Sequence, residues 1–136
     1  MARDFARSRR VEEQIQRLLS GAISSQLRDP RVAGVVITEV QASRDLAVAW
    51  VSYSLFGADE RPPAATLADA QAGLESAAGF LRSRLAGELN TRTVPELRFR
   101  YDEAGQRARD LERLIDDAVA RDTARGGGSP GTDGGS

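Results

Sequence analysis

The chain has 136 residues and a net charge of −1, a length that suggests one domain with a tail, and 40% hydrophobic residues suffice for a modest core. It contains no cysteine and no histidine, which excludes disulfides, thiolate chemistry, the usual general base and the commonest zinc ligand. No apolar run approaches the ~20 residues of a membrane span, and the basic N-terminus lacks an apolar signal region, so we expect a cytoplasmic protein without a membrane partner.

The first predicted element is a helix over about residues 6–28, where apolar side chains recur at helical spacing. It should end before Pro30, because proline disfavours helical geometry in the residue that precedes it. Two strands are then predicted, the first over the β-branched residues 34–42 and the second over residues 46–56. The short polar connection between them predicts an antiparallel hairpin.

A second long helix is predicted to begin with an N-cap at Thr66 and to run to about residue 90. The segment "ELRFRY" (96–101) alternates apolar and arginine side chains and predicts a half-buried strand. A last helix is expected near 105–121. We therefore place one domain in residues 1–121 and expect the Gly- and Ser-rich tail, 122–136, to be disordered.

The predicted fold class is α+β, with the order helix, strand, strand, helix, strand and then a C-terminal helix. Three strands need one covered face to be stable, and the two long helices can supply the cover. The other face of the sheet should stay open. One core is expected from eight apolar residues: Val11, Ile15, Leu18, Val51, Leu74, Leu81, Leu97 and Phe99.

No catalytic constellation is present in the sequence. The serines have no histidine to activate them, and the adjacent acidic pairs Glu12–Glu13 and Asp116–Asp117 should diverge on helix surfaces. There is no Walker-type phosphate loop and no dinucleotide fingerprint. We therefore expect no enzymatic activity, no cofactor and no metal site.

The arginines are unevenly distributed. Residues 1–31 hold seven arginines against four acidic residues, and residues 76–101 hold five against two. Genome composition explains the use of arginine in place of lysine but not the two clusters. Such clusters can neutralise the phosphates of a nucleic acid. The candidates are Arg7, Arg9, Arg10, Arg82, Arg84, Arg92, Arg98 and Arg100.

The α-β-β-α-β order is that of the type II KH-like fold. KH domains use a GXXG loop between two helices to bind a nucleic-acid backbone. This sequence has no GXXG, and Ala77-Ala78-Gly79 stands in the corresponding place, inside the second long helix. Glycine in a helix interior costs about 1 kcal/mol relative to alanine.

Four segments of the chain resemble the bacterial ribosome-binding factor A family. They are "ARSRRVEEQIQRLLS" near the start, "QLRDPRV" at the end of the first helix, "VQASRDLAVAWVSYSLFG" in the hairpin and "AAGFLRSRLAGELNTRTVPELRFRYD" around the last strand. Each segment is weak alone, but they are specific together in this order and spacing. The resemblance covers roughly residues 3–119.

The resemblance implies a KH-like fold in which an Ala-x-Gly kink replaces the GXXG loop. It implies a non-enzymatic assembly factor that binds the free small (30S) ribosomal subunit, assists late maturation of its rRNA near the 5′ end and supports growth in the cold. It also implies release linked to ribosome-associated GTPases, and we expect a monomer. The predicted RNA-binding residues are Arg7, Arg10, Arg31, Ala77, Ala78, Gly79, Arg82, Arg84, Arg92, Arg98 and Arg100.

The implied kink would divide the second helix at Gly79. A break there would expose the backbone N–H groups of the second half-helix beside Arg82 and Arg84, which is a natural site for an anion. On that hypothesis Gly79→Ala should destabilise the protein or weaken binding. An ordinary helix predicts the opposite sign for stability.

Two other functions stay open on the sequence. One is a generic KH-like module that binds single-stranded RNA off the ribosome, and the other is a small enzyme or a protein–protein adaptor. One residue also departs from the family pattern: Trp50 occupies the outward side of the second strand, where a polar or basic residue is expected. It is expected to pack beside Val36 or Thr38, with RNA stacking as the alternative.

Overall fold

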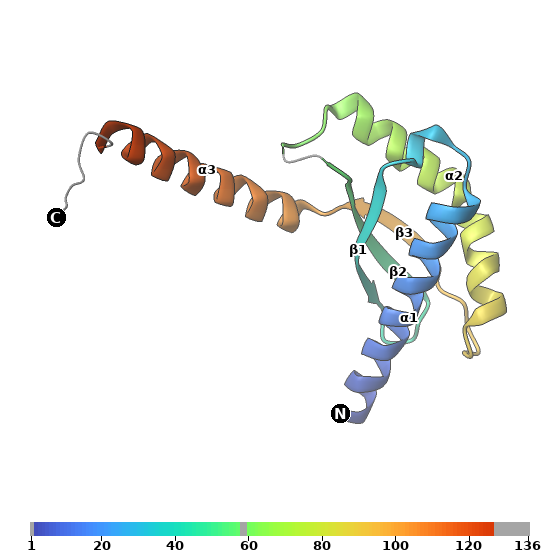
Figure 1. Ribbon diagram of the computed structural model, residues 1–136. Coiled ribbons are helices and arrows are strands. Elements are labelled where there is room, and N and C mark those ends of the chain that lie inside the picture. Colours follow the sequence, from blue (N-terminus) through green and yellow to red (C-terminus); the bar gives the residue numbers. More distant parts are fainter. Residues whose placement is uncertain (1, 58–59, 127–136) are drawn as a thin grey trace. The chain divides into compact units, whose positions relative to one another are not determined.

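The computed structural model describes residues 2–57 and 60–126. The predicted order of helices and strands is confirmed. The chain forms two compact units, the first ending at Asp102 and the second beginning at Glu103. The elements are α1 (Ala2–Gln26), the short 3-10 helix η1 (Pro30–Val32), β1 (Val35–Ala42), β2 (Val48–Leu55), α2 (Ala64–Glu88), β3 (Glu96–Tyr101) and α3 (Glu103–Gly126) (Figure 1).

The three strands form one sheet with β2 in the centre. Strand β2 pairs antiparallel with β1 and parallel with β3. The parallel pair requires a crossover connection, and α2 supplies it. Helices α1 and α2 cover one face of the sheet, and the other face of this unit is open (Figure 1).

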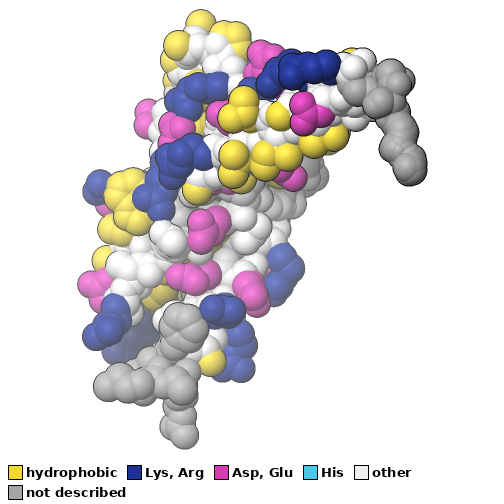
Figure 2. Space-filling view, turned by 90° about the vertical axis from the view of Figure 1, so that its left-hand side faces the viewer, with side chains coloured by type: hydrophobic (Ala, Val, Ile, Leu, Met, Phe, Trp, Pro, Cys, Tyr) yellow, Lys and Arg dark blue, Asp and Glu magenta, His cyan; other side chains and the backbone are white. Residues whose placement is uncertain are grey.

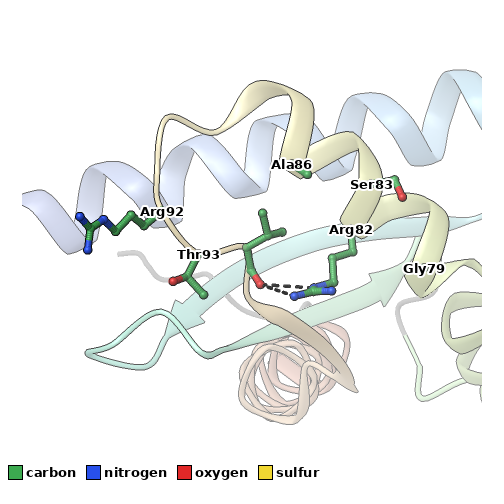
Figure 3. Close-up of a pocket in the computed structure, with 7 residues that line it drawn as sticks. Gly79, Arg82, Ser83, Ala86, Arg92 and Thr93 are labelled. Atoms are coloured by element: carbon green, nitrogen blue, oxygen red, sulfur yellow. Dashed lines mark hydrogen bonds between the residues drawn. The ribbon is translucent and has the colours of Figure 1, made fainter.

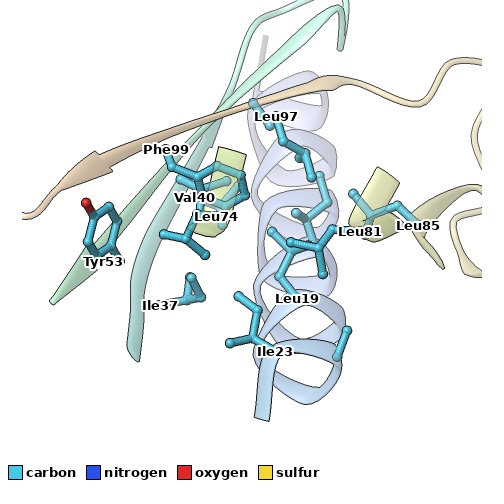
Figure 4. Close-up of a cluster of buried hydrophobic side chains, with 14 of the residues drawn as sticks. Leu19, Ile23, Ile37, Val40, Tyr53, Leu74, Leu81, Leu85, Leu97 and Phe99 are labelled. Atoms are coloured by element: carbon cyan, nitrogen blue, oxygen red, sulfur yellow. The ribbon is translucent and has the colours of Figure 1, made fainter. Parts of the chain in front are cut away.

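The core lies between the sheet and the two helices that cover it. Six of the eight predicted core residues are buried, with Leu81 fully enclosed and Phe99 6% exposed, so the predicted register is confirmed. The other two, Val11 and Leu18, are partly buried and pack against the core. Figure 4 shows how residues from both helices and all three strands meet there.

Strand β1 contains a bulge that its sequence pattern did not predict. The pairing with β2 shifts between Ile37 and Glu39, which leaves Thr38 as an extra residue. In a regular strand, residues three apart point to opposite faces. The bulge instead lets both Ile37 and Val40 enter the core. Thr38 donates a hydrogen bond from Oγ1 to the carbonyl of Ser52 at 3.3 Å.

The predicted N-cap of the second long helix is wrong by three residues. Helix α2 begins at Ala64 with Pro63 as its N-cap, and no described side chain makes a capping hydrogen bond. Thr66 therefore lies in the first turn and does not cap the helix. The fixed φ of proline suits the start of a helix, and at Pro63 φ is −55°.

A glycine of α2 allows this helix to approach η1 closely. A Cβ atom built on Gly73 would lie 2.7 Å from Cγ1 of Val32 and 3.2 Å from Cβ of Arg31. Gly73 and Val32 are both buried. The contact holds the segment after α1 against the middle of α2, so glycine is needed here because it has no side chain.

Side chains of α1 bond directly to strand β1. Glu12 accepts a hydrogen bond at 2.8 Å from the backbone N–H of Ala42, and Gln16 donates to the carbonyl of Ile37 at 3.3 Å. Glu12 is therefore a structural residue, whereas the sequence suggested a solvated one.

The last helix is longer than predicted. Helix α3 continues to Gly126, so residues 122–126 are helical and not part of a disordered tail. Residues 127–136 lie outside the described residues, and the domain boundary at 121 stays a prediction.

The apolar side chains of α3 form an exposed stripe, visible as a row in Figure 2: Leu111, Leu114, Ile115 and Val119. None of the helices described here is apolar over a stretch long enough to cross a bilayer.

Candidate nucleic-acid interface

A hollow of about 410 Å³ lies beside Gly79. One wall is the second half of α2, and the other is the loop that connects α2 to β3. Figure 3 shows the arrangement of the lining residues, with Arg82 on the helix and Arg92 on the loop. The lining is Gly79, Arg82, Ser83, Ala86, Arg92, Thr93 and Val94.

The exposed Arg82 holds the loop in place. Its Nη2 donates to the carbonyl of Val94 at 2.8 Å, and its Nε lies 3.2 Å from the carbonyl of Pro95 and 3.3 Å from that of Val94. A guanidinium has five N–H donors, so the group keeps donors for a ligand while it anchors the loop. The sequence-based view of Arg82 as a free phosphate ligand is therefore incomplete.

Arg92 is carried by the anchored loop. It is exposed, and it forms no hydrogen bond or ion pair with the residues that the structure describes. Its guanidinium points away from Arg82 in Figure 3. The two arginines thus line one hollow, but their charged groups are directed to different sides of it.

Helix α2 is not divided at Gly79. It is helical from Ala64 to Glu88 without interruption, and the φ of Gly79 is not positive. The axis of α2 bends along its length (Figure 1), so a change of direction is present without a break. The predicted set of free N–H groups after Gly79 is therefore wrong, because an unbroken helix uses them internally. Any anion here would depend on side chains.

A Cβ atom at Gly79 would meet no atom of the described residues within 4 Å. Gly79 is exposed at the edge of the hollow, while Ala77 and Ala78 are partly buried and pack against the core. The glycine therefore does not serve the packing of this unit. It leaves open surface beside Arg82.

Arg84 lies in a different hollow, between α1 and α2. This space of about 300 Å³ is also lined by Arg17 and Glu88. Arg84 forms no hydrogen bond or ion pair with the described residues. Two positions along a helix turn a side chain by about 200°, which is why Arg82 and Arg84 do not share a site.

Arg31 is occupied by an ion pair. Its guanidinium contacts both carboxylate oxygens of Asp29, with an Nη2 to Oδ2 distance of 2.7 Å. The hydrogen bonds from the Arg31 side chain and backbone lower the pKa of Asp29 below its ordinary value. Asp29 also caps η1 by accepting from the backbone N–H of Arg31. We assign Arg31 a structural role at the start of η1.

Arg98 and Arg100 lie on the open face of the sheet around Trp50. Their guanidinium carbons lie 5.6 and 5.0 Å from the centre of the indole ring, within the range of cation–π attraction. Arg98 also pairs with Glu96 at 3.1 Å. Trp50 therefore contacts two arginines, where the sequence suggested a contact with Val36 or Thr38.

Arg100 makes further bonds across the same face. It donates to Oε1 of Gln41 at 2.9 Å and to Oγ of Ser52 at 3.4 Å. This open face is separate from the hollow at Gly79, which is formed by α2 and its loop. The predicted arginines thus do not form one site.

Half of the predicted arginines have no partner within the described part of the chain. Arg31, Arg82, Arg98 and Arg100 bond to other residues, whereas Arg7, Arg10, Arg84 and Arg92 are exposed and make no hydrogen bond or ion pair there. The second group can bind phosphate without losing a structural contact. No cluster of three or more acidic residues in the described chain could hold a metal ion.

Sequence reasoning missed Arg44, which lies in the turn between β1 and β2 and lines a hollow together with Arg7. The turn was recognised only as polar. A basic residue at the tip of a hairpin is a sequence feature that could have indicated Arg44 as a binding residue. That Arg7 lies near it follows only from the fold.

Comparisons with known proteins agree on one family. The family model described as "Ribosome-binding factor A" matches residues 7–115. Ribosome-binding factor A of Nitrosomonas europaea is 47% identical over 121 residues, which is 89% of this chain and 99% of the relative. That of Alcanivorax borkumensis is 48% identical over 118 residues, covering 87% of this chain and 83% of the relative.

Solved structures with the same fold carry the same family name. The crystal structure of ribosome-binding factor A from Thermus thermophilus matches with a TM-score of 0.60 and 27% identity, over 71% of this chain and 97% of that one. A homology model of Thermus thermophilus ribosome-binding factor A, fitted into the cryo-EM map of its 30S complex, matches with a TM-score of 0.54 and 29% identity, over 69% of this chain and 93% of that one. The predicted KH-like fold is confirmed by these similarities.

Proposed function

The chain belongs to the ribosome-binding factor A family, and on this premise we propose that it binds the free small ribosomal subunit and assists late maturation of the small-subunit rRNA near its 5′ end. The similarity to a structure described as part of a 30S complex supports the choice of partner. The protein acts by binding and catalyses no reaction. We expect it to work as a monomer in the cytoplasm, to support growth in the cold and to be released with the help of ribosome-associated GTPases.

The observation that carries this proposal is the hollow beside Gly79. Its loop presents Arg92, which has no partner among the described residues, and Arg82 keeps donors after anchoring that loop. Guanidinium groups match the geometry of phosphate oxygens. Because glycine leaves the helix surface open at this point, an RNA backbone can approach α2 closely.

The other predicted arginines should contribute unequally to RNA binding. Arg7, Arg10 and Arg84 are exposed and have no partner in the described chain, so they can neutralise phosphates directly. Arg98 and Arg100 must first give up or share their bonds to the sheet. Each phosphate that is neutralised contributes about −0.7 to the slope of the logarithm of the affinity against the logarithm of the salt concentration. The four arginines without a partner in the described chain therefore give an expected slope of about −3.

The proposal is tested by sedimentation of the purified protein with ribosomal particles. We expect it to sediment with free small subunits and not with intact ribosomes. Arg92→Gln should reduce the affinity several-fold and lower the salt slope by about one. Arg28→Gln is the matched control, because Arg28 is an exposed arginine outside the predicted set.

Other outcomes favour other functions. Equal affinity for free single-stranded RNA and for the subunit would indicate a generic RNA-binding module. Failure to sediment with any ribosomal particle would contradict the proposal and favour an adaptor. The role in maturation is tested separately: cells that lack the protein should accumulate small-subunit rRNA with an unprocessed 5′ end, most strongly in the cold.

A further inference from the structure

A second hollow, of about 370 Å³, lies where three distant segments meet. They are the first turns of α1, the turn between β1 and β2, and the start of the loop between α2 and β3. It shares no lining residue with the hollow at Gly79. The residues used below are Arg7 and Val11 of α1, Arg44, Asp45 and Leu46 of the turn, and Thr91 of the loop.

Leu46 has an unusual backbone conformation. Its φ is +60°, the only positive φ of a non-glycine residue in the described chain. Glycine or asparagine normally occupies such a position, because a side chain is unfavourable there. The N–H of Leu46 closes the turn by donating to the carbonyl of Ser43 at 2.9 Å. Glycine would form the turn more easily, so a leucine at this position suggests that its side chain has a function other than forming the turn.

The Leu46 side chain lines the hollow together with Val11, and both are partly buried. Together they give the hollow an apolar surface. Its polar lining includes two arginines, Arg7 and Arg44. Both are exposed, and neither makes a hydrogen bond or ion pair with a described residue.

The carboxylate of Asp45 also lines the hollow, but it is used by the turn. Its Oδ1 accepts hydrogen bonds from Oγ of Ser43 at 2.9 Å and from the backbone N–H of Ala47 at 3.1 Å. The hollow thus combines an apolar surface, two arginines that have no partner among the described residues, and one carboxylate that already accepts hydrogen bonds within the turn. This combination fits a ligand that has a flat apolar part and a phosphate.

We propose that this hollow binds one unpaired nucleotide of the small-subunit rRNA, with its base against Leu46 and Val11 and its phosphate between Arg7 and Arg44. The inference rests on the proposed function. The volume lies in the range of small-molecule sites, roughly 300–1,000 Å³. Thr91 directly precedes Arg92, so neighbouring residues of one loop line both hollows, and one RNA strand passing that loop can occupy both.

The first test uses photocrosslinking on the small subunit. A benzophenone amino acid replaces Arg44 in one variant and Phe56 in the control variant, since Phe56 is 85% exposed at the other end of β2. At saturating concentration, the probe at 44 should crosslink to an rRNA nucleotide that is unpaired in the free subunit, and the probe at 56 should not. A bound variant whose probe at 44 reaches only a ribosomal protein, or no rRNA, would overturn the inference.

The second test measures affinity. Arg44→Gln should weaken subunit binding about threefold or more and lower the salt slope by about one, while Arg28→Gln leaves both unchanged. Leu46→Gly relieves the backbone strain and removes the apolar surface, so it should weaken binding while the protein stays folded. Unchanged affinity of both Arg44→Gln and Leu46→Gly would refute the inference. If the wild-type protein does not bind subunits, the proposed function itself fails, and this result is distinct from the others.

Discussion

Two glycines of helix α2, six residues apart, should respond in opposite ways to the same substitution. A Cβ atom at Gly79 would meet no atom of the described residues within 4 Å, and the residue is exposed. A Cβ atom at Gly73 would lie 2.7 Å from Cγ1 of Val32, which is only 2% exposed. We therefore expect Gly79→Ala to stabilise the protein and Gly73→Ala to destabilise it.

The magnitudes follow from helix propensity and packing. Alanine in place of glycine in a helix interior is worth about 0.5–1 kcal/mol, partly through the entropy of the unfolded chain. For Gly79→Ala this should raise the melting temperature by about 2–8 °C in a domain of this size. At Gly73 the same gain is opposed by an overpacking cost of about 1–3 kcal/mol, because Val32 has little space in which to move. A net loss of about 1 kcal/mol is expected.

Urea unfolding followed by the fluorescence of Trp50, the only tryptophan, measures both changes. The background Val32→Ala supplies a control, since it removes the atom that the new methyl group would contact. In this background Gly73→Ala should cost about 1 kcal/mol less, whereas the effect of Gly79→Ala should be additive within about 0.5 kcal/mol. A destabilised Gly79→Ala, or a stabilised Gly73→Ala, would refute the reasoning.

The same Gly79→Ala protein also tests the binding surface. If RNA approaches the backbone of α2 at this point, the variant should bind small subunits more weakly although it is more stable. If its affinity is unchanged, Ala77, Ala78 and Gly79 are not part of the RNA-binding surface. Stability and affinity must therefore be measured on the same preparation.

Three further predictions concern single side chains. Arg82→Gln loses hydrogen bonds to two loop carbonyls and should lower the free energy of unfolding in urea by about 1 kcal/mol, while Arg84→Gln should change it by less than about 0.5 kcal/mol. Burial, and secondarily nearby negative charge, raises the pKa of the Tyr53 hydroxyl, which donates to Gln71 at 2.7 Å. The contribution of Tyr53 to the free energy of unfolding is thus complete below about pH 10 and falls as the pH rises further. If the stability of Tyr53→Phe falls with rising pH in the same way as that of the wild type, this prediction is contradicted. Asp29 has a lowered pKa because its arginine partner bonds to the carboxylate. Its contribution to the free energy of unfolding is therefore present above about pH 4 and is lost in acid. In Asp29→Asn, stability should fall less steeply as the pH is lowered through the acid range.

Much of the fold could be predicted from local pattern. The alternation in residues 96–101 gave the bounds of β3, and helical periodicity placed Leu81 in the core. These predictions succeeded because periods of two and 3.6 residues report which face of an element is buried. The same reasoning did not find the bulge at Thr38, because a bulge is stabilised by pairing with β2 and has no local period.

The candidate site was less predictable. Arginines cluster in the sequence, but the structure alone showed that Arg31 is occupied by Asp29 and that Arg82 anchors a loop, whereas Arg92 is available. The availability of a charged group depends on neighbours in space, and composition carries no information about them. Arg44 was missed for the same reason, since Arg7 lies 37 positions away in the chain.

The sequence by itself determined the order of the elements, the buried faces of α1, α2, β2 and β3, and the family. Tertiary structure alone separated the roles of Gly73 and Gly79, two of the glycines of α2. Both residues cost the helix the same propensity, so helix propensity does not distinguish them. Only the approach of η1 to α2 makes Gly73 a packing requirement, and only the fold shows that the surface around Gly79, which the sequence already made a candidate for binding, is open. The physical reason is that steric contact between segments distant in the chain depends on the full fold, whereas propensity and periodicity depend on neighbours in sequence.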